Sequence, residues 1–205
     1  VVRAPPRRRV VLRAAPSPGR GGPGGRAGGT GAPGGRAVRP PAAPAGADDE
    51  VSVSVLVVED HPLVATGLQL ALQARDWQVA TTSGPTVEAV VDLACDLRPD
   101  CVLLDLHLGD ELGTGLALIP PLRATGATVV MLTAETDVYL LASCVEAGAE
   151  GWIGKDAFLD EIVASVEQVL AGRPLIGRAR REELLDDLRI RRDSLTRALT
   201  PFERL

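Results

Sequence analysis

The sequence predicts an α/β fold in which one parallel sheet carries helices on both of its faces. Apolar stretches of strand length alternate five times with stretches of helical periodicity between residues 51 and 172. The central stretch, CVLLD at 101–105, is continuously apolar up to its last residue, which is typical of a strand buried on both faces. Right-handed crossovers leave few strand orders, and we expect the flavodoxin-like order 2-1-3-4-5 of a doubly wound (βα)5 sheet.

The expected strands share apolar composition and turn residues at their ends. The first begins with alternating polarity and becomes continuously apolar, and the third ends in Asp105. In chain order they are VSVSVLVV (51–58), WQVAT (77–81), CVLLD (101–105), TVVMLTA (128–134) and GWIGK (151–155).

The expected helices have apolar residues at helical spacing and recognisable ends. Pro62 suits the first turn of the first helix, Pro99 follows the end of the second, and Gly148 closes the fourth. The third is expected to be irregular, because Pro120 and Pro121 interrupt it. The expected ranges are 63–74, 86–97, 113–126, 137–148 and 157–172.

Charge and composition divide the chain into three parts, which we expect to be a disordered tail (1–50), a folded domain (51–173) and a charged linker helix (174–205). Residues 1–47 contain nine Arg, no acidic residue and 20 Gly or Pro, too few apolar side chains for a core. The remaining 158 residues carry 13 basic and 27 acidic side chains. A domain this acidic is a poor candidate for binding nucleic acid by itself.

Cysteine content and hydropathy indicate the cellular compartment in which the protein works. The three cysteines, Cys95, Cys101 and Cys144, lack metal-ligand spacing and lie among apolar residues, so we interpret them as small buried hydrophobes of a reducing compartment. No apolar run approaches the ~20 residues that span a bilayer. We therefore expect a cytoplasmic protein without a membrane partner.

Three carboxylates are expected at one edge of the sheet. The first strand is followed by Glu59 and Asp60, the third ends in Asp105, and the predicted order makes these strands neighbours. Three like charges in one small volume would raise their pKa values or push the loops apart, and a bound Mg²⁺ ion removes that conflict. The backbone carbonyl of His107 is also within reach of such an ion, whereas the rings of His61 and His107 are expected to be exposed loop residues.

The same edge receives a hydroxyl and an ammonium group. Thr133 ends the fourth strand and Lys155 the fifth. A carboxylate can act as a nucleophile toward phosphorus, and phosphoryl transfer needs positive charge and hydrogen bonds on the phosphoryl oxygens. Each of these residues has a simpler interpretation when it is considered alone. Asp60 is then a helix N-cap and Asp105 a turn former, while Thr133 is an ordinary strand-end residue and Lys155 an ordinary surface lysine. Their joint position favours phosphorylation of Asp105.

These residues resemble the receiver domain of two-component response regulators, and most closely the NarL/FixJ subfamily. The segments VLVVEDHPLVATGLQLAL, PDCVLLDLHLGD, VVMLTA and EAGAEGWIGKDAFLDEIVASVEQVLAG match in order and spacing over about 53–172. The resemblance implies that Asp105 is the phospho-acceptor and that Glu59, Asp60 and Asp105 bind Mg²⁺. It also implies that Thr133 and Lys155 contact the phosphate, and that Trp152 is the aromatic switch residue.

Two segments depart from the family pattern. The loop GDELGTG after the acceptor strand lacks the usual proline, and IPPLRATG has two prolines where the third helix normally runs. Both affect the third helix and its loop, and neither alters the acidic pocket.

The C-terminal segment is charged with interspersed leucines. Leu184, Leu188, Leu195 and Leu199 fall near one helical face, which can pair with a second copy or pack on the receiver, or belong to a solvated linker. The final PFERL resembles the segment that precedes the LuxR-type helix-turn-helix in this subfamily. We expect DNA binding only through a C-terminal domain that this chain lacks.

The resemblance therefore implies a switch and not an enzyme. A sensor histidine kinase is the expected phosphoryl donor, and a homodimer is the expected phosphorylated form. One alternative is a docking module that works without phosphorylation. The other is an aspartate-nucleophile phosphatase of the haloacid-dehalogenase type, but such enzymes carry a second aspartate where this chain has His107.

Overall fold

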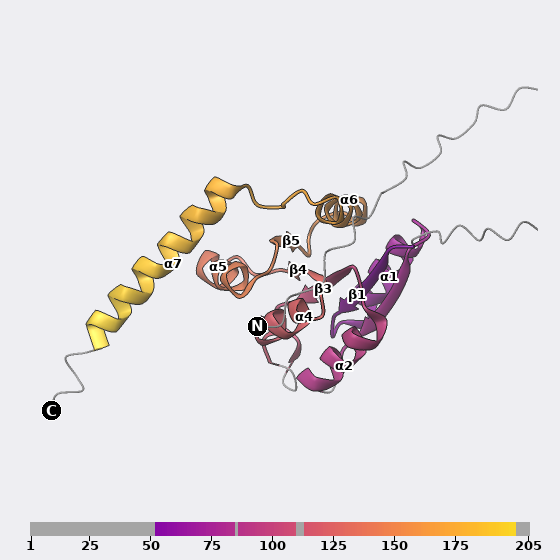
Figure 1. Cartoon of the computed structure of the whole chain (residues 1–205), viewed down its shortest axis with the longest axis horizontal. Helices are drawn as coiled ribbons and strands as arrows, with labels where there is room; N and C mark the ends of the chain where they lie inside the picture. Colours follow the sequence, from indigo (N-terminus) through magenta and orange to yellow (C-terminus); the bar gives the residue numbers. More distant parts are fainter. Residues whose placement is uncertain (1–51, 85, 110–112, 200–205) are drawn as a thin grey trace, which may run out of the picture. The chain divides into compact units, whose positions relative to one another are not determined.

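The structure is a computed structural model that describes residues 52–84, 86–109 and 113–199 (Figure 1). The predicted disordered tail, 1–50, lies outside the described residues, as do parts of the GDELGTG loop and the PFERL segment. Within the described ranges, no helix combines the length and the apolar character needed to cross a membrane.

The elements alternate as the sequence predicts. The strands are β1 (Ser54–Val58), β2 (Gln78–Thr82), β3 (Cys101–Asp105), β4 (Thr128–Thr133) and β5 (Trp152–Gly154). The helices are α1 (Pro62–Gln73), α2 (Val87–Leu97), the 3-10 turn η1 (Gly115–Leu118), α4 (Ile119–Ala124), α5 (Val138–Ala147), α6 (Leu159–Leu170) and α7 (Arg178–Leu199).

The five strands form one parallel sheet in the order β2-β1-β3-β4-β5, which confirms the predicted fold class. All five residues of the central strand β3 are buried, as its continuous apolar character predicts. In register, Val58 of β1 pairs with Leu104, Asp105 pairs with Leu132 of β4, and Thr133 pairs with Gly154 of β5. The carboxyl ends of these strands therefore meet at one edge.

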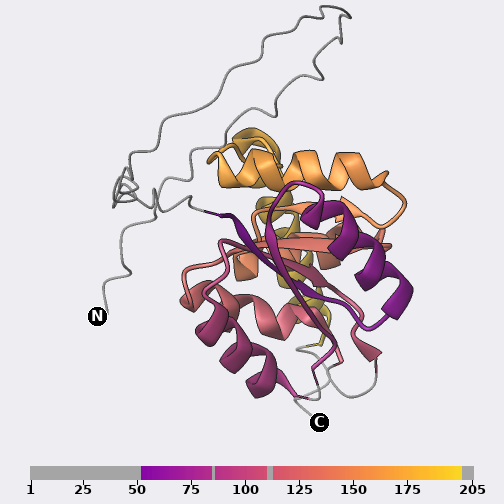
Figure 2. The same cartoon turned by 90° about the vertical axis from the view of Figure 1, so that its right-hand side faces the viewer.

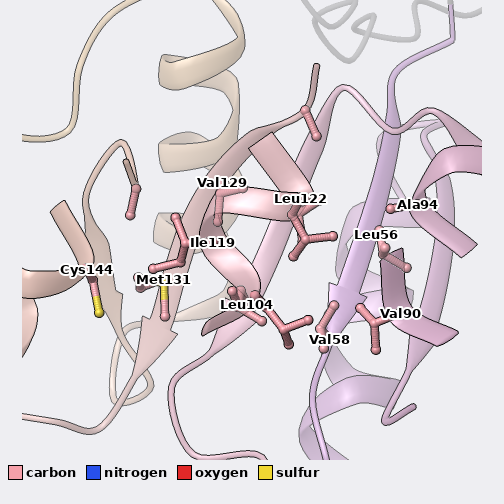
Figure 3. Close-up of a cluster of buried hydrophobic side chains, with 14 of the residues drawn as sticks. Leu56, Val58, Val90, Ala94, Leu104, Ile119, Leu122, Val129, Met131 and Cys144 are labelled. Carbon is pink, nitrogen blue, oxygen red and sulfur yellow. The ribbon is translucent and has the colours of Figure 1, made fainter. Parts of the chain in front are cut away.

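Helices cover both faces of the sheet. Helices α1 and α6 contact each other on one face, and α2, α4 and α5 follow one another on the other face, as Figures 1 and 2 show. Figure 3 shows side chains of the second face pointing from the strands toward α2, α4 and α5. This cluster includes Leu56, Val58, Val90, Ala94, Leu104, Ile119, Leu122, Val129, Met131 and Cys144. Because each strand alternates its side chains between the faces, its other side chains point toward α1 and α6, and the central strand is buried on both faces.

The two prolines of IPPLRATG begin a helix instead of interrupting one. Pro120 and Pro121 lie in the first turn of α4, directly after η1. The first backbone N–H groups of a helix have no intrahelical acceptor, so proline costs no hydrogen bond there. The expected irregular helix is thus a 3-10 turn followed by a short α-helix.

The C-terminal helix α7 lies beside α5 (Figure 1). Its Leu184 and Leu188 are buried in a cluster with Ala142 and Val145 of α5. Of the three arrangements that the sequence left open for this leucine face, packing on the receiver is the one observed. Leu195, further along the same face, is exposed.

The interpretation of the cysteines as buried hydrophobes is correct for two of the three. Cys101 on β3 and Cys144 on α5 are buried, but Cys95 on α2 is exposed, and all three are free thiols. The interpretation failed for Cys95 because α2 is amphipathic: Ala94 faces the core, and its neighbour therefore points to solvent.

Candidate functional site

Four side chains from two strand ends converge at the carboxyl edge of the sheet. Glu59, Asp60 and His61 follow β1, and Asp105 ends the neighbouring strand β3. One ligand atom from each of the four lies within 4.8 Å of all the others. Glu59 and Asp105 are 3% and 2% exposed, so their charges are largely removed from water. The structure thus brings together the three carboxylates that the strand order places at this edge.

Lys155, just after β5, reaches across the sheet edge to two of these acids. Its Nζ lies 2.8 Å from Asp105 Oδ2 and 2.7 Å from Glu59 Oε2. Desolvation lowers the pKa of Lys155, but hydrogen bonds and charge interactions with Asp105 and Glu59 together outweigh it and leave the pKa raised. The ammonium group therefore stays charged and compensates part of the buried negative charge.

Two buried carboxylate oxygens lack a well-formed hydrogen bond among the described residues. Glu59 Oε2 lies 2.7 Å from Lys155 Nζ and Asp60 Oδ1 lies 2.8 Å from His61 Nδ1, but neither accepts a hydrogen bond of good geometry. Buried polar atoms in proteins are rarely left without a hydrogen bond. Hard carboxylate oxygens in such a cluster are the donor set that Mg²⁺ takes, so the residues present fit a divalent cation.

His61 is the exposed loop residue that the sequence predicts, and its ring also contacts this cluster. Its side chain is 67% exposed, yet Nδ1 lies 3.0 Å from Glu59 Oε1 and 2.8 Å from Asp60 Oδ1. The hydrogen bond to Glu59 is the main cause that raises the pKa of His61, and the charge of Asp60 adds to it. His61 is also the N-cap residue of α1. The sequence, considered for Asp60 alone, suggested Asp60 for this position. In the sequence, the sign of this contact was the position of His61 directly after Glu59 and Asp60.

Thr133 ends β4, one strand away from Asp105, and is 1% exposed. Its hydroxyl oxygen accepts a hydrogen bond from the backbone N–H of Glu135 at 3.1 Å, and its carbonyl accepts one from Lys155 N at 3.0 Å. The Glu135 carboxylate in turn accepts hydrogen bonds from the backbone N–H groups of Asp137 and Thr136, which lower its pKa. Glu135, which no sequence pattern singled out, links Thr133 to the start of α5.

The loop after β3 returns close to the acidic cluster. The backbone N–H of Gly115 donates to Leu106 O at 2.8 Å, and a Cβ at position 115 would overlap the carbonyl oxygen of Asp105. A Cβ at Gly109 would lie 3.3 Å from Asp60 Oδ2. Glycine therefore lets the backbone approach both acids.

His107 and Trp152 lie around the cluster rather than in it. The His107 backbone bridges to Thr114, and its ring Nε2 lies 3.4 Å from Glu135 Oε2. Its role as a carbonyl ligand of the metal stays a prediction. Trp152 is half-buried on β5, three residues before Lys155, and packs against the core that includes α5.

The match to known proteins agrees with this geometry. The model of the response regulator receiver domain family matches residues 55–167. The chain belongs to this family. The matched residues run from β1 through most of α6 and include every residue of the acidic cluster and Lys155.

Relatives of this receiver are named as transcriptional regulatory proteins or as response regulators. The chain is 28% identical over 123 residues to the transcriptional regulatory protein YdfI of Bacillus subtilis (strain 168), covering 60% of this chain and 57% of the relative. It is 29% identical over 157 residues to the nitrate/nitrite response regulator protein NarL of Escherichia coli (strain K12), covering 74% and 71%. The match spans a little over half of the length of YdfI.

A solved structure is similar to the same part of the chain. It is a response regulator protein from Burkholderia pseudomallei, described as having a phosphorylated aspartic acid, a calcium ion and citrate. The TM-score is 0.52 at 25% identity, covering 59% of this chain and 70% of that one.

An apolar groove of about 230 Å³ adjoins Lys155 of the receiver. It lies between the start of α1, which contributes Leu63 and Leu68, and the start of α6, which contributes Leu159 and Ile162. Leu63, Leu159 and the neighbouring Phe158 are exposed. Large apolar side chains gathered at the rim of a polar site are typical of a surface that binds another protein.

Proposed function

We propose that this protein is a phosphorylation-controlled switch of two-component signalling, with Asp105 as the phospho-acceptor and a histidine kinase as the donor. One observation carries the proposal: the buried Asp105 carboxylate is held by the Lys155 ammonium at 2.8 Å, within a cluster of two further acids. The phosphorylated aspartic acid of the Burkholderia pseudomallei relative supports the same chemistry.

The transfer requires one bond to form and one to break. An oxygen of the Asp105 carboxylate attacks the phosphorus of a phosphohistidine, and the P–N bond breaks as the P–O bond forms. The imidazole nitrogen leaves with the electron pair and takes up a proton. Lys155 compensates the charge on the phosphoryl oxygens, as it compensates Asp105 and Glu59 before transfer.

Magnesium fits the acidic cluster. Glu59, Asp60 and Asp105, with the backbone carbonyl of His107, are the groups that we expect to hold Mg²⁺, which would supply positive charge to the phosphoryl oxygens. Because the His61 imidazole now lies against Glu59 and Asp60, we expect His61 to move when the ion binds.

Thr133 would report phosphorylation to the rest of the molecule. Its hydroxyl accepts from Glu135 N in this structure, and it can turn to donate to a phosphoryl oxygen. That change would release the backbone N–H of Glu135 from the Thr133 hydroxyl. It would thereby shift the conformational equilibrium of the loop between β4 and α5, and with it that of the Trp152 side chain.

We further propose where the partners act. The apolar rim formed by Leu63, Phe158 and Leu159 is suited to the helices of a kinase, because it adjoins Lys155. The name of the relative YdfI supports regulation of transcription as the output. We propose that the protein acts in the cytoplasm and that self-association of the phosphorylated receiver is a step toward that output. On this proposal the protein transmits a signal and is not an enzyme with a released product.

Acetyl phosphate provides the test. Incubation with acetyl phosphate and Mg²⁺ should add one phosphoryl group, detected by intact-protein mass spectrometry. Asp105→Asn should abolish the addition, while Asp96→Asn, which removes an exposed carboxylate on α2, should leave it unchanged. Addition that survives Asp105→Asn would refute the acceptor assignment. No addition to the unaltered protein would instead favour a docking module that works without phosphorylation.

A further inference from the structure

The helix α7 makes an interface with α5 that combines apolar and polar contacts. Leu184 and Leu188 are 1% and 4% exposed, and they pack in a cluster with Ala142, Val145 and Ile176. Trp152 and two partly buried leucines complete the rim of this cluster. A solvated linker helix would leave its leucines in water, so α7 is an integral part of the folded domain.

Arginines of α7 hold α5 at both of its ends. Arg181 Nη2 donates to the carbonyl oxygens of Ala149 at 3.0 Å and Val145 at 3.3 Å, at the C-terminal end of α5, where the helix dipole favours a cation. Arg192 Nη1 lies 2.6 Å from Glu146 Oε2. The guanidinium of Arg191 lies 3.8 Å from the centre of the Tyr139 ring, in the first turn of α5.

Two segments that contact α7, the helix α5 and Trp152 of β5, are connected to residues around the acidic cluster. The start of α5 follows Glu135, whose N–H group bonds the Thr133 hydroxyl. Trp152 of β5 packs against the α7 cluster and pairs with Met131, while Lys155, three residues later, binds Asp105. A rearrangement of Thr133 or Lys155 therefore reaches the surface on which α7 lies by two short routes.

We propose that α7 is an intramolecular clamp that favours the unphosphorylated receiver, and that phosphorylation of Asp105 weakens its attachment to α5. This inference rests on the proposed function, because it requires a phosphoryl group at Asp105. Linkage makes the effect reciprocal: if phosphorylation loosens α7, loosening α7 must strengthen binding of a phosphoryl mimic by the same factor.

A matched pair of α7 variants tests the clamp. Leu188→Asp places a charge in the buried cluster, and Ile190→Asp places the same charge two residues away on the exposed side of the helix. Beryllium fluoride serves as the phosphoryl mimic, and its dissociation constant with Mg²⁺ is measured by fluorine NMR on the full chain. We expect Leu188→Asp to lower this constant about fivefold or more, and Ile190→Asp to leave it unchanged.

A second pair avoids the core, so that a folding defect cannot imitate the effect. Arg192→Glu sets two acids against each other at Glu146, and should lower the dissociation constant in the same direction. Combining it with Glu146→Arg restores opposite charges and should return the constant toward that of the unaltered protein. Hydrogen exchange of the α7 amides should rise when beryllium fluoride is added to the unaltered protein.

The outcomes separate the two proposals. If the mimic binds the unaltered protein, but with equal affinity to Leu188→Asp and Arg192→Glu, the clamp is refuted and the phosphorylation switch stands. If the mimic does not bind the unaltered protein at all, the proposed function fails and the clamp fails with it.

Discussion

At the scale of single residues, Lys155 is the cation on which the acidic cluster depends in the absence of metal. It contacts Glu59 and Asp105 together, and both acids are almost completely buried. Removing one partner of such a group leaves charges that neither water nor a counter-ion compensates.

Lys155→Met should therefore destabilise the metal-free protein at neutral pH. We expect a loss of about 2 kcal/mol in the free energy of unfolding, below the range for fully buried pairs, because Lys155 retains some solvent contact. Urea denaturation in the presence of a chelator measures it, and Mg²⁺ should recover part of the loss. Arg75→Met, which breaks the more exposed pair with Glu167, is the control and should have little effect. Equal losses in the two variants would contradict this account.

The three thiols should differ in reactivity. Burial raises the pKa of Cys101 to about 12 and is the main cause that raises the pKa of Cys144 to about 11, whereas Cys95 is exposed. Iodoacetamide at neutral pH should modify Cys95 alone in the folded protein and all three after unfolding, as read by peptide mass spectrometry. Modification of Cys144 at the rate of Cys95 would show that α5 leaves the sheet readily.

The same shifts have a consequence at alkaline pH. An unfolded thiol ionises near its ordinary pKa of 9.0, while the buried Cys101 thiol remains protonated to about 12. The folded state then holds more protons than the unfolded state, so the stability contributed by this thiol declines as pH rises from about 9.

At the scale of elements, the backbone of η1 approaches the end of β3 so closely that Gly115 has no room for a side chain. Gly115→Ala should force the loop away from Asp105, cost about 2 kcal/mol of stability and slow phosphorylation by acetyl phosphate. Gly67→Ala on α1 is the matched control. Apart from the backbone of α1 itself, no atom lies within 4 Å of its added Cβ, so the methyl group should be neutral or stabilising by up to about 1 kcal/mol. Thermal denaturation and intact mass measure the two effects.

The strands and most helix ends follow from the sequence because apolar periodicity and turn residues act locally. Pro120 and Pro121 show where that reasoning fails: the same residue that breaks a helix interior is favoured in a first turn, and only the packed structure fixes where the helix begins.

The candidate site also contains residues that the sequence could predict and residues that it could not. Glu59, Asp60, Asp105, Thr133 and Lys155 could be grouped because each ends a strand at one edge of the sheet. His61 and Glu135 could not, because their contacts depend on side-chain rotamers and on the path of a loop. The packing of α7 on α5 was one of three arrangements that the leucine pattern allowed.

At the scale of the whole molecule, the folded domain concentrates negative charge in the acidic cluster at one edge of its sheet. A divalent cation bound there should stabilise the folded domain as a whole. A ligand that binds only the folded state raises its stability in proportion to the logarithm of ligand concentration over Kd. Mg²⁺ should therefore raise the Tm of the unaltered protein.

Asp60→Asn should cancel that rise without lowering the Tm of the metal-free protein. Asp60 adds repulsion to the cluster but does not pair with Lys155 among the interactions of the described residues. Differential scanning calorimetry with and without Mg²⁺ separates the two effects. The same Mg²⁺-induced shift in Asp60→Asn as in the unaltered protein would remove Asp60 from the ion's ligands.

The position of Trp152 gives the molecule a built-in optical reporter. The chain has only one other tryptophan, Trp77, which lies just before β2 at the opposite side of the sheet. In a Trp77→Phe background, the emission of a single indole between the phosphoryl pocket and α7 would follow activation in real time, without any attached dye.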